Sequence, residues 1–248
     1  MIVAVVFAFI FVVIFFYYKT LRENEENKLR RRTLEIERTL LRTQMNPHFI
    51  FNALNSIQNF IVSNNSLDAE RYLSKFAKLM RMILDNSMKQ NITLDNELLS
   101  LTLYIDLEKA RFNNRFTYQI NIDDNIEEEL ILVPAMLIQP FVENAILHGL
   151  LHKNDDNGLI TIDITENPDK HLLTCSITDN GIGRKAAAEY SKTNKGHHSV
   201  GMQLTRDRLK DLNKETEGIS CNIEDLYDSS GNALGTKVTI LIPYTEDV

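Results

Sequence analysis

The hydrophobic pattern of this 248-residue chain changes near Phe116, and that change limits the possible folds more than any other feature. Residues 19–112 carry apolar side chains at helical spacing, whereas apolar and polar side chains alternate in Phe116–Ile122 and in later segments. Helices followed by mixed strands and helices predict an α+β protein whose C-terminal part is an α/β sandwich. The length allows one sizeable core plus a smaller element, or two small domains.

An uncharged apolar segment, Ile2–Tyr18, stands at the start of the chain. It is close to the shortest helix that spans a bilayer, and it lacks the basic start and the cleavage site of a signal peptide. Basic residues follow it, notably Lys28 and Arg30, which favours a cytoplasmic location for everything after the segment. We therefore predict a transmembrane helix over residues 1–18, with a buried helix as the alternative. Nothing precedes it, so either it senses within the membrane or the sequence begins partway through a longer protein.

Residues 19–44 contain no glycine or proline and predict a coiled-coil linker, with a single solvated helix as the alternative. Residues 45–115 predict a helical hairpin and a third helix. The expected elements are a helix to about Val62 that Pro47 interrupts, a turn at Ser63–Ser66, and helices over Leu67–Met88 and Leu94–Phe112. Two amphipathic helices cannot bury both faces alone, so we expect a homodimer with a four-helix bundle.

Residues 116–248 predict the sandwich domain. Its expected strands are Phe116–Ile122, Leu159–Ile164, Leu172–Thr178, Ile219–Leu226 and Lys237–Ile242, and its expected helices are Pro134–Leu151 and Met202–Lys214. The net charge of −7 comprises +3 in residues 19–44 and −10 in residues 45–248, and such an acidic body argues against a nucleic-acid partner. Cys175 and Cys221 lack metal-type spacing, and we expect buried free thiols rather than a disulfide.

The first candidate site is Asn46-Pro47-His48-Phe49-Ile50-Phe51-Asn52, placed within a helix. A proline in mid-helix costs about 3 kcal/mol, and such violations gather at functional sites. A neutral imidazole is a competent nucleophile at cytoplasmic pH, which makes His48 a candidate, although a lone helical histidine is usually only a polar residue. Asn52 lies one turn later on the same face, where its amide could orient a water for phosphatase activity or bond locally.

The second candidate site is the segment Gln139–Gly149, in which Glu143, Asn144 and His148 interrupt an apolar helix. Asn144 and His148 are four residues apart and share a face. An amide oxygen suits Mg²⁺, which takes oxygen ligands and keeps several waters while it bridges phosphates. A helix capped by its own polar residues near Gly149 is the alternative.

Three glycine-containing segments complete the pattern. Asp179 ends a strand and begins Asp-Asn-Gly-Ile-Gly, where a carboxylate could accept a hydrogen bond from an amine such as that of adenine. The segment Gly196–Gly201 leads into a predicted helix, as anion-binding loops do. Gly235-Thr236 opens the last predicted strand. An ordinary turn and a flexible loop are the alternatives for the first two.

In this order the motifs resemble those of LytS-type sensor histidine kinases, over about residues 40–243, and Pro-His-Phe-x-Phe-Asn is specific to that class. The resemblance implies a Bergerat-fold ATPase domain, like that of gyrase and MutL, with ATP and Mg²⁺ as cofactors. It implies that His48 is the phosphoacceptor, Asn144 the Mg²⁺ ligand and Asp179 the partner of the adenine amine. Further nucleotide-binding residues would be His148, the lid glycines Gly181, Gly183, Gly196 and Gly201, and Thr236, which would support Asp179 through a water.

The sequence departs from many histidine kinases at Phe49, where an acidic residue often serves as base, and Glu143 is our candidate for that role. The resemblance predicts a membrane-anchored kinase of a two-component system that autophosphorylates His48 and then phosphorylates an aspartate of a separate response regulator, of LytTR type. Two other readings are a dimeric nucleotide-binding scaffold without catalysis and a gyrase-like ATPase. The latter would not need a histidine beside a helix-breaking proline.

Overall fold

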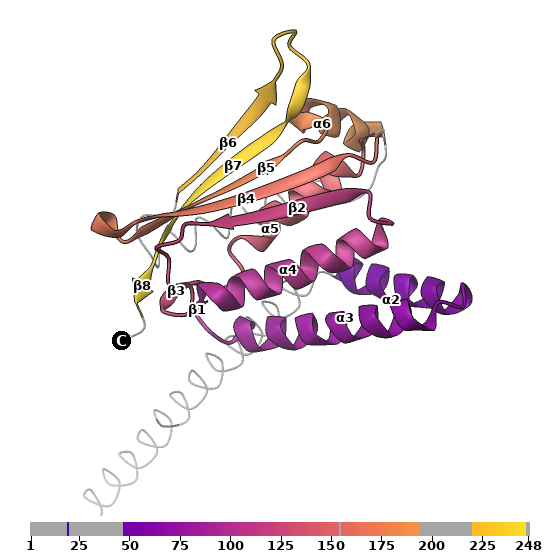
Figure 1. The fold of residues 1–248 in the computed structure, drawn as a ribbon, viewed down its shortest axis with the longest axis horizontal. Coiled ribbons are helices and arrows are strands. Elements are labelled where there is room, and N and C mark those ends of the chain that lie inside the picture. The colour runs from indigo at the N-terminus through magenta and orange to yellow at the C-terminus, as the bar shows by residue number, and fades with distance from the viewer. Residues whose placement is uncertain (1–18, 20–46, 154, 194–219, 247–248) are drawn as a thin grey trace, which may run out of the picture. The chain divides into compact units, whose positions relative to one another are not determined.

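The structure is a computed structural model that describes residues 19, 47–153, 155–193 and 220–246 (Figure 1). The chain forms two compact units, Met1–Phe51 and Asn52–Val248. The predicted transmembrane helix and nearly all of the predicted linker lie outside the described residues. Within the described ranges, no helix combines the length and apolar character that a membrane span requires. The predicted domain boundaries at residues 18, 44 and 115 stay predictions.

The helices of the N-terminal half confirm the helical pattern of the sequence. They are α2 (Pro47–Val62), α3 (Ser66–Ser87) and α4 (Leu94–Arg111). The side chain of Asn65 caps α3 by accepting the backbone N–H of Asp68, and Thr93 caps α4 in the same way at Asn96. The Phe60 ring of α2 lies 5.7 Å from the Tyr72 ring of α3, which closes the hairpin.

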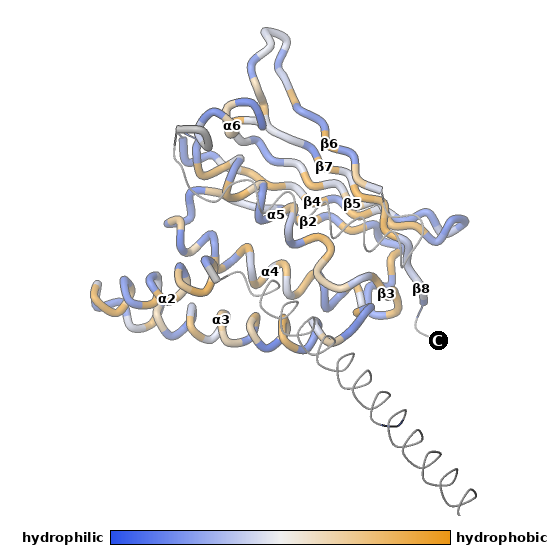
Figure 2. The backbone as a smooth tube through the Cα atoms, turned by 180° about the vertical axis from the view of Figure 1, so that it is seen from behind, coloured by the Kyte–Doolittle hydropathy of each residue, from blue (hydrophilic) through white to orange (hydrophobic). Residues whose placement is uncertain are grey.

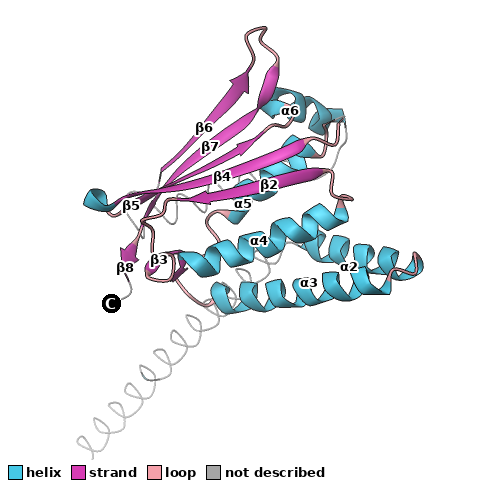
Figure 3. Ribbon diagram, viewed as in Figure 1, coloured by secondary structure: helices cyan, strands magenta, loops and turns pink. Residues whose placement is uncertain are grey.

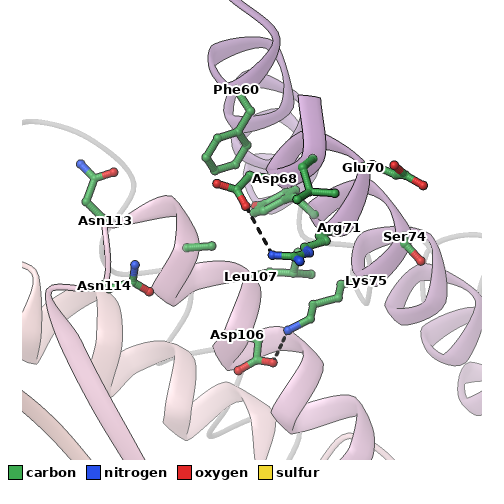
Figure 4. A pocket seen from close by; sticks show the side chains of 13 residues that line it. Phe60, Asp68, Glu70, Arg71, Ser74, Lys75, Asp106, Leu107, Asn113 and Asn114 are labelled. Atoms are coloured by element: carbon green, nitrogen blue, oxygen red, sulfur yellow. Dashed lines mark hydrogen bonds and ion pairs between the residues drawn. The ribbon is translucent and has the colours of Figure 1, made fainter. Parts of the chain in front are cut away.

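Helix α4 joins the hairpin to the sheet, because Asp106 has partners on both sides. Its carboxylate accepts a hydrogen bond from the Lys75 ammonium of α3 at 2.5 Å and one from the Tyr118 hydroxyl of strand β2 (Phe116–Ile122) at 2.8 Å. Figure 4 shows the first of these pairs across a hollow of about 890 Å³ between α3 and α4. In Figures 1 and 2, α4 lies between α3 and the sheet.

Among the described residues, the main sheet has five strands in the order β2-β4-β5-β7-β6, and only the pair β2 and β4 is parallel (Figure 3). The strands are β2 (Phe116–Ile122), β4 (Gly158–Asn167), β5 (Leu172–Asp179), β6 (Ser220–Tyr227) and β7 (Ala233–Pro243). Four of them contain the predicted strands in full, and β6 matches the predicted Ile219–Leu226 except for Ile219, which lies outside the described residues. Strand alternation gives the sheet one buried face, and its side chains include Ile160, Ile162, Ile164, Leu173, Cys175, Ile177, Ile240 and Ile242.

A second sheet has the order β1-β3-β8, formed by β1 (Asn91–Thr93), β3 (Ile131–Pro134) and β8 (Thr245–Glu246). These strands have two to four residues, too short for alternation to reveal them. Neither cysteine forms a disulfide: Cys175 is buried, as expected, whereas Cys221 is only half-buried.

The predicted helix over Pro134–Leu151 is confirmed only from Gln139 to Leu150, and its predicted start and its regularity are wrong. Pro134 ends β3, a turn follows, and the helical part divides into α5 (Gln139–Asn144) and the π-helical turn η1 (Ala145–Leu150). The turn contains Met136 at φ 57°, a left-handed conformation that no helix interior accepts. The structure also adds helix α6 (Gly183–Thr193) and a short 3₁₀ turn (Pro168–Lys170), neither of which is among the predicted elements.

Candidate functional site

Asp179 is the last residue of β5, and strand alternation places it on the buried face of the sheet. Its exposed fraction is only 5%. The carboxylate accepts a hydrogen bond from the backbone N–H of Gly181 at 2.8 Å. It also accepts one from that of Thr236, which is paired with Asp179 on the neighbouring strand β7. Burial raises the pKa of Asp179 to about 6, although these two hydrogen bonds act to lower it. The carboxylate is therefore an acceptor held in a nearly dry position at the end of a strand.

Glycines pack so closely around Asp179 that side chains would not fit. A Cβ on Gly149, at the end of η1, would lie 2.7 Å from the Asp179 Oδ1 atom. A Cβ on Gly181 would lie 2.4 Å from the Gly149 carbonyl carbon, and the Gly149 oxygen accepts the N–H of Ile182 at 3.2 Å. The turn after β5 thus lies directly against the backbone of η1. Gly149 has a packing role that sequence reasoning missed, although it ended the motif that carries Asn144.

Gly235 is the second residue that sequence reasoning underestimated. It adopts φ 132°, and a Cβ there would lie 1.8 Å from the Asp179 carbonyl oxygen. Only glycine permits this approach of β7 to β5. A short polar side chain reinforces the turn from the other side, because Asn180 accepts the N–H of Leu159 at 2.8 Å and donates to the carbonyl of Asn157 at 2.9 Å. Gly183, with φ 76°, begins α6 against Ala233.

The second motif lies beside this carboxylate. Asn144 is the last residue of α5, His148 lies in η1, and both are half-buried. Because Gly149 of η1 contacts Asp179, the chain from Asn144 to Gly149 leads into the Asp179 site. Single π-helical turns inside α-helices are frequent at functional sites.

Glu143 faces a different environment, a buried cluster on α4. Burial raises the pKa of Glu108 to about 7, the ion pair with Arg111 lowers it, and repulsion from Glu143 raises it further. Burial likewise raises the pKa of Tyr104 well above its usual range, with Glu143 as a further cause. Glu143 thus lies near two groups of α4 that have little contact with solvent. Its role as base stays a prediction.

The first motif lies on α2, away from the glycine cluster in sequence. His48 is exposed in the first turn of the described part of α2, Phe49 is buried, and Asn52 is half-buried. The Asn52 carbonyl accepts the Ser56 hydroxyl at 2.9 Å, a local helical bond. Residues 20–46 lie outside the description, so the mid-helix position of Pro47 stays a prediction. Gly196 and Gly201 also lie outside the described residues.

The polar groups of the site suit a nucleotide with its Mg²⁺. A carboxylate offers about four acceptor positions, and the two backbone N–H groups at Asp179 leave capacity for an exocyclic amine. The tight glycines bring the backbone of η1 and of the turn after β5 close to that carboxylate. The Asn144 amide supplies an oxygen of the type that Mg²⁺ binds. In the part of the chain that the structure describes, no group of three or more His, Cys, Asp or Glu residues is arranged to hold a metal ion, but Mg²⁺ held by one side chain and phosphates needs none.

Comparisons with known proteins agree with the motifs. The family model for histidine kinases matches residues 36–116. The chain is 35% identical over 205 residues to the sensor protein LytS of Staphylococcus epidermidis, covering 82% of this chain and 33% of that protein. It is 32% identical over 204 residues to the sensor histidine kinase/phosphatase LytS of Staphylococcus aureus, covering 82% of this chain and 34% of that protein. The chain thus spans about a third of the length of these relatives.

Two solved structures have weaker similarity. The histidine kinase domain of a blue-light activated histidine kinase from Erythrobacter litoralis has a TM-score of 0.44 at 15% identity, covering 85% of this chain and 95% of that one. The histidine kinase ThkA, solved in complex with the response regulator protein TrrA, has a TM-score of 0.42 at 16% identity, covering 90% and 66%. Neither score is high enough to add to the argument from sequence.

Proposed function

The chain is a relative of the LytS-type sensor histidine kinases, as its motifs predicted, and from this premise we propose that it uses ATP and Mg²⁺ to phosphorylate its own His48. The phosphoryl group would then pass to an aspartate of a separate response regulator. The observation that carries the proposal is the Asp179 carboxylate, buried among glycines with acceptor capacity left over, in a chain that also bears the exposed His48.

In the proposed nucleotide site, Asp179 accepts the amine of adenine, and Gly149 and Gly181 let the backbone of η1 and of the turn after β5 pack against that carboxylate. The Thr236 backbone N–H orients the carboxylate. Its hydroxyl would also support Asp179 through a water. Asn144 would hold Mg²⁺, which neutralises phosphate charge when bound. His148, in the same turn as Gly149, would line the phosphate side, with Gly183 at the start of the lid.

At His48, a neutral imidazole nitrogen attacks the γ-phosphorus of ATP, the bond from that phosphorus to the bridging oxygen breaks, and ADP leaves. The attacking nitrogen has no proton to lose, and the other nitrogen keeps its own until a base removes it. Glu143 is the proposed base. Phosphoryl transfer depends mainly on positioning and charge neutralisation, so a weak base suffices. Asn52 would orient a water for phosphatase activity, which removes phosphate from the aspartate of the regulator.

We further propose that the protein is a homodimer anchored in the cytoplasmic membrane by residues 1–18, with the described residues in the cytoplasm. Apolar side chains exposed on the hairpin support the dimer, since a four-helix bundle from two chains would bury them. They are Leu54, Ile61 and Val62 of α2 and Leu73, Leu84 and Met88 on or after α3. The regulator would be of LytTR type, by the same family resemblance.

The alternative is a dimeric scaffold that binds nucleotide without catalysis. Incubating the full chain with γ-labelled ATP and Mg²⁺ separates the two functions. We expect label on the protein that is lost in acid and kept in base, as phosphohistidine requires. A chain that binds ATP but takes up no label would be the scaffold.

Nucleotide recognition should depend on pH through Asp179. Its pKa is about 6 in the free protein, and the ionised carboxylate is the stronger acceptor for an amine. Affinity for adenosine, which has no phosphate to titrate, should be constant above pH 7 and fall by up to about tenfold per pH unit below 6. Calorimetry from pH 7.5 to 5, with circular dichroism to confirm folding, measures this. A flat profile would contradict the assignment of Asp179.

A further inference from the structure

Glu97 is a carboxylate buried in the first turn of α4, with an exposed fraction of 1%. Its Oε2 atom accepts the backbone N–H of Met136 at 2.8 Å, and its Oε1 atom accepts that of Ile138 at 3.1 Å. An ionised carboxylate in the interior is costly unless charge-assisted hydrogen bonds compensate for lost water. Glu97 therefore connects α4 to backbone 39 and 41 residues further along the chain.

The segment that Glu97 holds is strained and leads directly into α5. Residues 135–138 connect β3 to α5 and are all buried. Met136 has φ 57°, a conformation that costs a non-glycine residue roughly 1–3 kcal/mol. Such a conformation persists only where the surrounding structure enforces it. Ile138, just before α5, has no side-chain cap of its own. The two hydrogen bonds to Glu97 supply that enforcement, because they hold the N–H groups of Met136 and of Ile138 at the entrance to α5.

The position of α5 decides where Asn144 lies. Helix α5 has only six residues, fewer than two turns, and Asn144 is the last of them. A shift of the backbone at Ile138 would therefore move the Asn144 amide by a similar amount. Helix α4 also contacts α3 through Asp106 and Lys75, so the same helix contacts the hairpin and the lead into α5.

We propose that Glu97 is a positioning residue for Asn144: by holding Met136 and Ile138 it fixes α5 and so places the Asn144 amide toward nucleotide-bound Mg²⁺. The inference rests on the proposed function, because that function assigns Mg²⁺ to Asn144. In this proposal Glu97 itself does not contact the nucleotide.

The test compares ATP affinity of the full chain with and without Mg²⁺, for wild type and Glu97→Gln. Glutamine keeps the shape but replaces one acceptor by a donor that cannot pair with a backbone N–H. We expect the Mg²⁺-dependent gain in affinity to fall about tenfold, as when support behind a metal-binding group is removed, while Mg²⁺-free affinity changes less than about threefold. In the free protein, the amide proton resonances of Met136 and Ile138 should move upfield.

Asp95→Asn is the matched control, since Asp95 is an exposed carboxylate in the same turn of α4, and it should change neither affinity. Glu97→Asp retains the charge but reaches less far, and its loss of Mg²⁺-dependent affinity should be intermediate; it decides the question if Glu97→Gln does not fold. Equal losses with and without Mg²⁺, or no loss with both resonances moved, would overturn the positioning role. Wild-type protein that fails to bind ATP would instead refute the proposed function, and this inference with it.

Discussion

Asp179→Asn should abolish measurable nucleotide binding by the full chain while leaving it folded. The ionised carboxylate is the charge-assisted acceptor for the adenine amine, and an amide turned to satisfy Gly181 and Thr236 has no equivalent oxygen to offer. We expect affinity for ATP to fall at least about a hundredfold, since loss of a charged partner in a dry site costs about 3 kcal/mol or more. Calorimetry measures it, with Asp169→Asn, an exposed carboxylate in the turn before β5, as the control.

The same substitution should stabilise the free protein. The folded pKa of Asp179, about 6, lies above the unfolded value of 3.8, so the folded state binds the proton more tightly. Stability is therefore lost as pH rises from about 4 to 6, and above pH 6 the buried charge costs up to about 3 kcal/mol. Asparagine removes the charge, and at pH 7.5 the free energy of unfolding should rise by roughly 1–2 kcal/mol, since one amide hydrogen replaces an acceptor.

Thermal unfolding followed by circular dichroism tests this gain, which should shrink below pH 6. A variant that loses both binding and stability would show that Asp179 holds the turn after β5 rather than the nucleotide. A variant that keeps ATP affinity would remove Asp179 from the site altogether. Loss of binding together with increased stability is expected only of a charge buried for recognition.

Local sequence pattern predicted the regular elements well. Alternation in Phe116–Ile122 gave β2 with its observed bounds, because one face of that strand is buried or half-buried and the other is exposed. Helical spacing gave α3 and α4 within one residue at each end, and Asn65 and Thr93 cap them as short polar side chains do. These features depend on neighbours close in sequence, which is why one sequence reveals them.

The site was only partly predictable, because its decisive contacts join distant residues. The motifs contained Asp179, Gly181 and Asn144, but nothing local indicates that Gly149 contacts the Asp179 carboxylate or that Gly235 touches its carbonyl. The division of the predicted helix into α5 and η1 likewise depends on the turn at Met136, which Glu97 holds from α4. Three-residue strands such as β1 exist only through their partners.

His48→Gln should abolish autophosphorylation, with acid-labile label falling at least about a hundredfold, because an amide is no nucleophile toward phosphorus. The exposed side chain at the start of the described α2 is not part of the core, so folding should be unaffected. Affinity for ATP should stay within about twofold, since uncharged surface substitutions change stability and binding little. Labelling with γ-labelled ATP, followed by acid and base treatment, measures the phosphate, and calorimetry measures the affinity.

Three other substitutions make the assignment specific. Asn52→Ala, one turn along α2, should keep autophosphorylation and slow only the loss of phosphate from the regulator. His152→Gln removes another described histidine, which stacks on Tyr190 at 5.0 Å between ring centres, and should keep full labelling. His148 lies in η1, and His148→Gln should change ATP affinity while the label stays on His48. Acid-labile phosphate that persists in His48→Gln but disappears in one of the other histidine variants would move the phosphoacceptor there, because only the nitrogen that attacks phosphorus can carry that label.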